Sequence, residues 1–231
     1  MSGPEAPGWH GKLPSLGDFA SRRLDAAFVE AWDGWLAAGL LELRKANPAG
    51  WLDAYLASPS WRFLLMPGVL PGECARQGWA GVLMPSVDRV GRYFPFTIAL
   101  PLGESPSTTQ QMTALWHWLG RLDELALDAM HDDWSVDRLE DELARMARPA
   151  LEPVGAPPAA PAAAGALQAV PLADGLDAAA VIGSEAQALW RARSAGLAWW
   201  FACPEQAGRR LLVSRGLPAP AAVGALLAAT I

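Results

Sequence analysis

Residues 61–100 read WRFLLMPGVLPGECARQGWAGVLMPSVDRVGRYFPFTIAL, and this stretch decides the fold class. It contains three apolar and aromatic runs that are typical of strands, at residues 61–66, 79–84 and 93–100. The links between the runs are short and contain Pro or Gly, which favours antiparallel neighbours. The sequence therefore predicts an antiparallel meander. Because Pro95 cannot donate a ladder hydrogen bond, we expect an edge or a bulge at that point of the third strand.

Two long amphipathic segments flank the meander. Residues 25–46 repeat apolar side chains at gaps of three and four, which places one apolar stripe on a helix, and Asp25 is a suitable N-cap. Residues 108–130 show the same periodicity after the meander. Ser107, with Gln110 three residues later, has the form of a capping box. The sequence therefore predicts two long helices, one on each side of the strands along the chain.

Shorter elements complete the expected fold. We expect a strand at residues 8–13, helices at residues 51–56, 136–147, 185–193 and 221–229, and a hairpin of residues 197–203 and 210–214. Residues 150–177 are rich in Ala, Pro and Gly, which predicts a linker or a long surface loop. This order predicts an α/β protein with a mixed, largely antiparallel sheet and helices on both faces, a three-layer sandwich.

Charge and hydropathy restrict the class of function. The formal net charge of the 231-residue chain is −6 and its Arg residues are scattered, which argues against nucleic acid as a partner. No stretch approaches the roughly 20 apolar residues of a membrane span, and residues 1–12 lack a signal-peptide pattern. We therefore expect a cytoplasmic protein without direct membrane insertion. Cys74 and Cys203 are expected to be reduced thiols.

Sequence patterns for catalysis and for cofactors are weak. Gly11-Lys12 lacks the earlier Gly and the following Ser or Thr of a phosphate loop. His117 and His131 lie about 21 Å apart on one expected helix, too far to share a metal ion. Ser15 and Ser86 lack the Gly-x-Ser-x-Gly frame of hydrolases. We therefore expect no enzymatic activity, no metal site and no cofactor.

Two segments combine Gly, Pro, Asp and Arg with aromatic residues. The first is GKLPSLGDF at residues 11–19, followed by two arginines, and the second is PSVDRVGRYFP at residues 85–95. Loops on a rigid scaffold often carry binding, but Asp turns, Arg–carbonyl contacts and positive φ at Gly17 and Gly91 would also explain these residues. Both interpretations apply to the eight candidate residues, Lys12, Asp18, Arg22, Arg23, Ser86, Asp88, Arg89 and Arg92.

These two segments resemble the TagF family of type VI secretion loci. Members of that family open with a GKLPxxGDF-type motif and carry a GVLxPSVDRVGRYFP block, which corresponds here to residues 81–95. Four further family motifs match: Trp-Asp-x-Trp-Leu at 32–36, Pro-x-Trp-Arg-Phe at 59–63, Leu-x-Trp-Trp at 197–200 and Arg-Gly-Leu-Pro at 215–218. The resemblance runs from about Trp9 to Leu227.

The resemblance implies a regulatory role. It implies one TagF-like domain over residues 8–231 and a cytosolic protein that restrains assembly of the secretion machine after translation. The expected mechanism is stoichiometric binding to a protein partner, the forkhead-associated scaffold protein of the secretion system. Two alternatives are an enzyme or small-molecule sensor that uses the Asp/Arg loops, and a structural subunit of the secretion apparatus.

Overall fold

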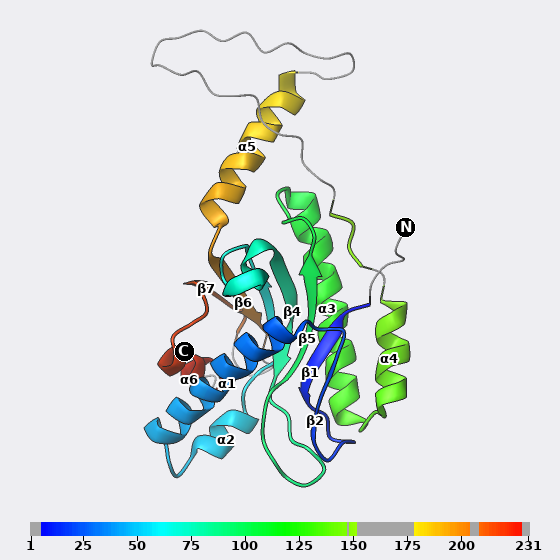
Figure 1. Cartoon of the computed structure of the whole chain (residues 1–231), viewed down its shortest axis with the longest axis vertical. Coiled ribbons are helices and arrows are strands. Elements are labelled where there is room, and N and C mark those ends of the chain that lie inside the picture. The colour runs from blue at the N-terminus through cyan, green and yellow to red at the C-terminus, as the bar shows by residue number, and fades with distance from the viewer. Residues whose placement is uncertain (1–5, 147, 152–177, 204–207, 228–231) are drawn as a thin grey trace.

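A computed structural model describes residues 6–146, 148–151, 178–203 and 208–227 (Figure 1). At its centre is a seven-stranded sheet in the order β2-β1-β5-β4-β3-β6-β7. The strands are β1 (Gly8–Lys12), β2 (Phe19–Arg22), β3 (Trp61–Leu65), β4 (Gly78–Met84), β5 (Phe96–Leu102), β6 (Leu197–Ala202) and β7 (Arg210–Arg215). All pairings between these strands are antiparallel, so the predicted meander is confirmed as β3-β4-β5.

Helices lie on both faces of the sheet (Figure 1). They are α1 (Ala26–Ala46), α2 (Trp51–Leu56), the 3-10 helix η1 (Gly72–Arg76), α3 (Thr109–His131), α4 (Val136–Arg145), α5 (Ala178–Ser194) and α6 (Pro220–Leu227). The α1-side core consists of the buried residues between the sheet and α1, α2 and α6. The α3-side core consists of those between the sheet and α3 and α4. The predicted three-layer α/β sandwich is therefore confirmed.

The period-two alternation of strands divides the large side chains between the two cores. In β3, Trp61 and Phe63 belong to the α1-side core, whereas Leu64 belongs to the α3-side core. In β6, Trp200 is buried in the α1-side core, and its neighbour Trp199 packs, half-buried, against the α3-side core. The two adjacent tryptophan rings therefore lie on opposite faces of the sheet.

The C-terminal elements complete the α1-side core. β6 pairs with β3, and α6 packs on α1. Trp61 Nε1 donates a hydrogen bond to the carbonyl of Leu226 in α6 over 3.1 Å. Gly39 permits the close approach of the two helices, because a Cβ at this position would lie 2.5 Å from Cβ of Val223. β6 and α6 therefore belong to the same sheet and core as β3 and α1.

Some element boundaries differ from those expected. β5 begins at Phe96, so Pro95 precedes the strand and needs no ladder hydrogen bond. The capping box of α3 is formed by Thr108 and Gln111, one residue later than expected, and Gln111 N donates to Thr108 Oγ1 over 3.1 Å. Asp25 occupies the N-cap position of α1 as predicted, although its side chain makes no capping hydrogen bond.

Three segments differ from the expectation in kind or extent. β2 and η1 were not expected from the sequence, and α5 begins at Ala178, before the expected helix at residues 185–193. The expected linker at residues 150–177 lies outside the described residues, except for residues 150 and 151. Within the described ranges, no helix is both long enough and apolar enough to cross a membrane.

Candidate functional site

The two polar loops, residues 13–18 and 85–95, meet at one end of the sheet. The first connects β1 to β2 and the second connects β4 to β5. Because β1 and β5 are antiparallel neighbours, the end of β1 lies beside the start of β5 and brings the loops together. Gly11 has a φ of 128°, and a Cβ there would lie 2.2 Å from the carbonyl oxygen of Pro95. Only glycine fits this approach, which explains the first residue of the GKLP motif.

A buried ion pair joins the end of β1 to the second loop. Lys12 Nζ lies 2.6 Å from Asp88 Oδ2, and the two side chains are 3% and 0% exposed. The other Asp88 oxygen accepts hydrogen bonds from the backbone N–H groups of Val90 (3.0 Å) and Arg92 (2.9 Å). Burial alone would raise the pKa of Asp88, but the hydrogen bonds from Lys12, Arg92 and Val90 hold that pKa well below its usual value. The carboxylate therefore stays charged and fixes the turn.

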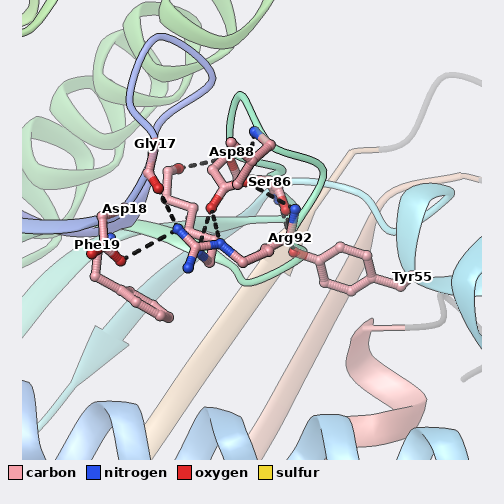
Figure 2. Close-up of polar contacts among 9 residues, drawn as sticks. Gly17, Asp18, Phe19, Tyr55, Ser86, Asp88 and Arg92 are labelled. Atoms are coloured by element: carbon pink, nitrogen blue, oxygen red, sulfur yellow. Dashed lines mark hydrogen bonds and ion pairs between the residues drawn. The ribbon is translucent and has the colours of Figure 1, made fainter.

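Ser86 connects the second loop to β1 and to α2. Its hydroxyl donates to the carbonyl of Lys12 over 2.7 Å. Its backbone N–H donates to Tyr55 Oη (2.8 Å), and that hydroxyl donates to the carbonyl of Ser86 (3.0 Å; Figure 2). Tyr55 is fully buried and was missed as a site residue, because an isolated Tyr in a short helix carries no sequence signal for this contact.

Arg92 extends the network to the first loop (Figure 2). Its Nε donates to Asp88 Oδ2 over 2.8 Å, and its Nη2 donates to the carbonyl of Gly17. The same Nη2 lies 3.4 Å from Asp18 Oδ1, on a side chain that is 80% exposed. Gly91 has the expected positive φ of 82°, whereas Gly17 does not adopt a positive φ. The expected arginine contacts with Asp and carbonyl groups are therefore present.

Adjacent arginines after the first loop have different environments. Arg23 has a φ of 56°, and its Nε and Nη2 donate to the carbonyl of Pro7 over 3.1 and 2.9 Å. Its guanidinium also pairs with Glu140 in α4. Burial alone would raise the pKa of Glu140, but the hydrogen bonds from Arg23 contribute to lowering it. Arg22 is exposed and donates to the carbonyl of its neighbour Ser21.

The eight candidate residues therefore divide into two groups. Those that hold the backbone in place are Lys12, Arg23, Ser86, Asp88 and Arg92. Those with exposed side chains and few or no contacts beyond their own loop are Asp18, Arg22 and Arg89. The contacts of the first group agree with the loop-fixing interpretation, and the binding interpretation stays a prediction for the second group.

An open hollow of about 720 Å³ adjoins the loops, between β2 and the first turns of α1. Phe19 forms part of its lining and is 46% exposed. The ring of Phe19 lies 4.3 Å from Lys12 Nζ and contacts Phe94 edge-on at 4.9 Å between ring centroids. Sequence reasoning missed this hollow because it did not predict β2.

Metal-ligating and thiol groups are dispersed in the described part of the chain. No group of three or more His, Cys, Asp and Glu side chains is arranged there to hold a metal ion. Cys74 and Cys203 are free thiols, the first buried and the second exposed. Burial, together with the nearby carboxylates of Asp25 and Glu73, raises the pKa of Cys74. Its thiol is therefore less prone to ionise than an exposed one.

Comparisons with known protein families identify the class of protein to which this fold and these two loops belong. The family model described as TagF N-terminal domain, type VI secretion system-associated, matches residues 8–146. The chain belongs to this TagF family. The crystal structure of PA0076 from Pseudomonas aeruginosa PAO1 is similar over 96% of this chain and 94% of that chain, with 32% sequence identity and a TM-score of 0.74. No curated protein matches the chain.

Proposed function

We propose that this chain is a post-translational repressor of a type VI secretion system. It acts in the cytoplasm by stoichiometric binding, without catalysis, and its partner is the forkhead-associated scaffold protein of that system. Membership of a family associated with type VI secretion supports the setting. The observation that carries the binding role is the division of the loop residues into those that fix the loop backbone and those with exposed side chains and few contacts beyond their own loop.

The buried members of the fixing group, Ser86 and Asp88 among them, are poorly placed for chemistry. A nucleophilic hydroxyl needs access to a substrate and an adjacent base. The Ser86 hydroxyl is instead buried and donates to the carbonyl of Lys12. The Asp88 carboxylate is occupied by Lys12, Arg92 and two backbone N–H groups. The residues best suited to react are therefore used to hold the loops, which favours a binding role.

The exposed group is well placed for recognition. Arg89 and Val90 lie at the tip of the second loop, and Val90 is 63% exposed. Phe19 and Arg22 are exposed at the neighbouring strand. Arginine and aromatic side chains often dominate protein interfaces, and a loop that is already fixed loses little conformational entropy on binding.

A titration in cells tests the stoichiometric mechanism. This protein and the scaffold protein are expressed from independent promoters, and release of a secreted effector is measured. Repression should follow the ratio of the two proteins, so additional scaffold protein restores secretion by mass action. Silencing by a small substoichiometric amount at every scaffold level would rule out sequestration. Fractionation provides a second test, because a structural subunit would travel with the membrane-bound apparatus.

A further inference from the structure

Helix α5 is anchored to the rest of the protein only near its C-terminal end. Trp190 Nε1 donates to the carbonyl of Pro106 over 3.1 Å, and the Trp190 ring lies 5.9 Å from that of Trp199. Arg191 Nη2 donates to Glu104 Oε2 over 3.0 Å. From these contacts α5 extends away from the sheet, and no other described helix or strand packs along it (Figure 1). One side of α5 is therefore left uncovered by the described part of the chain.

The uncovered side of α5 carries a stripe of apolar side chains. Ile182 and Leu189 are each 69% exposed. They are seven residues apart, which is about two helical turns, so they lie on the same face of the helix. Ala186 is exposed between them on that side. Exposed apolar side chains that repeat along one helix face are typical of a helix that packs on a further element.

Two opposite charges flank the stripe. Glu185 precedes Leu189 by four residues and Arg193 follows it by four, which places them about 40° to either side of Leu189 on the helix. They lie about 12 Å apart along the axis, too far to pair with each other. Neither forms a salt bridge with another described residue. Each charge therefore lacks an opposite charge that a second element on this face can supply.

The stripe and its charges are complementary to themselves. A two-fold axis through Leu189, perpendicular to α5, produces an antiparallel pair of α5 helices. Leu189 then faces Leu189 of the second copy, and residues equally far before and after it are level. Glu185 of each copy consequently lies beside Arg193 of the other. A parallel pair would instead place like charges side by side. A two-fold interface requires this self-complementarity, because both copies contribute the same surface.

We propose that α5 is a self-association surface, through which two copies of this chain pair antiparallel about Leu189. The helix has 17 residues, so the contact is smaller than a standard interface of about 1,600 Å². We therefore expect a concentration-dependent dimer with a Kd on the order of 10–100 µM. This inference goes beyond the proposed function. A dimer carries two copies of the polar loops, which strengthens binding to a partner with more than one site.

Sedimentation velocity of the full chain tests the dimer, over concentrations from about one tenth to about ten times the expected Kd. The wild-type chain should pass from monomer to dimer over this range. Leu189→Glu puts two carboxylates at the centre of the contact and should weaken dimerisation at least about tenfold. The matched control is Leu211→Glu on β7, where the leucine is 58% exposed, and it should leave the dimer unchanged. Thermal unfolding shows that each variant is folded.

Charge reversal tests the antiparallel arrangement and does not depend on the leucine variant. Glu185→Arg and Arg193→Glu each place like charges together at both ends of the contact, so each should weaken the dimer about fivefold at low salt. The double variant restores opposite charges in both contacts and should return to the wild-type Kd. A mixture of the two single variants should also associate more tightly than either variant alone, because every contact between unlike copies then joins opposite charges.

The possible results either support or overturn this inference. A chain that stays monomeric over the whole range overturns it. A dimer that Leu189→Glu leaves intact, or that Leu211→Glu weakens equally, places the contact elsewhere and also overturns it. A double variant as weak as the single variants overturns the antiparallel pairing. Weaker scaffold binding by Leu189→Glu in a chain that stays monomeric assigns the stripe to the scaffold protein instead. None of these results contradicts the proposed function, which the secretion assay tests separately.

Discussion

Charge reversal at two neighbouring positions, Arg22→Glu and Arg23→Glu, should give opposite results. Arg23 donates to the carbonyl of Pro7 and pairs with Glu140, and its side chain is 31% exposed. Hydrogen bonds that involve a charged group contribute about 1.5–3 kcal/mol to stability. A new carboxylate facing Glu140 adds repulsion, which solvent at this partly exposed position reduces. We therefore expect Arg23→Glu to lower the free energy of unfolding by about 2–4 kcal/mol.

The same reversal at Arg22 should leave the fold intact. The side chain of Arg22 is exposed and, among the described residues, donates only to the carbonyl of Ser21, so the change in unfolding free energy should stay within about 0.5 kcal/mol. At this chain length 1 kcal/mol shifts the thermal midpoint by about 2–4 °C, so the two variants are easily separated. Circular dichroism gives the midpoint, and calorimetric titration with the scaffold protein gives the affinity. Arg22→Glu should lose affinity with an unchanged midpoint.

Two results would refute this reasoning. Equal midpoints for Arg22→Glu and Arg23→Glu would show that the contacts with Pro7 and Glu140 do not stabilise the fold. Unchanged affinity of Arg22→Glu for the scaffold at moderate salt would place the interface elsewhere on the molecule. Arg23→Lys is a useful control, because it keeps the charge but loses the planar guanidinium that donates to two acceptors at once.

Three further predictions concern stability. Trp200→Ala should cost about 3–5 kcal/mol, because the ring is buried in the α1-side core, and half-buried Trp199→Ala about half as much. Denaturant unfolding checks both values, and a folded Trp199→Ala that no longer binds the scaffold would make that ring an interface anchor. Gly39→Ala should lower the thermal midpoint by its clash with Val223, and adding Val223→Ala should recover part of the loss. Asp88 has a lowered pKa, so its contribution is complete above about pH 4, the usual pKa of Asp, and is lost as pH falls toward the folded value. Asp88→Asn should therefore weaken the acid dependence of unfolding.

Local patterns were sufficient to predict most elements of the fold. The strands of the meander and of the C-terminal hairpin are runs of apolar and aromatic residues with turn residues between them, and both long helices show clear periodicity. β2 was missed because Phe19–Arg22 is short and half polar, so it becomes a strand by pairing with β1 rather than by its own propensity. The position of β6 beside β3 also depends on contacts distant in sequence.

The candidate site was predicted as a set of residues but not as an arrangement. Turn chemistry identified Asp88 and Arg92, and both bind as that chemistry requires. The partnership of Lys12 with Asp88 requires β1 to lie beside β5, which no local pattern in either segment indicates. Arg22 and Arg23 are identical in type and adjacent in sequence, so only their environments in the fold distinguish them.

The pairing of β3 with β6 has a consequence for synthesis on the ribosome. β3 is translated early, and its outer edge and the face of Trp61 stay uncovered until β6 and α6 have left the exit tunnel. At bacterial elongation rates this interval is on the order of ten seconds. The nascent chain therefore presents an unpaired strand edge and aromatic surface throughout that time, and we expect it to bind chaperones that act during translation. Stalled or truncated products that lack the last strands should aggregate rather than accumulate as a smaller folded protein.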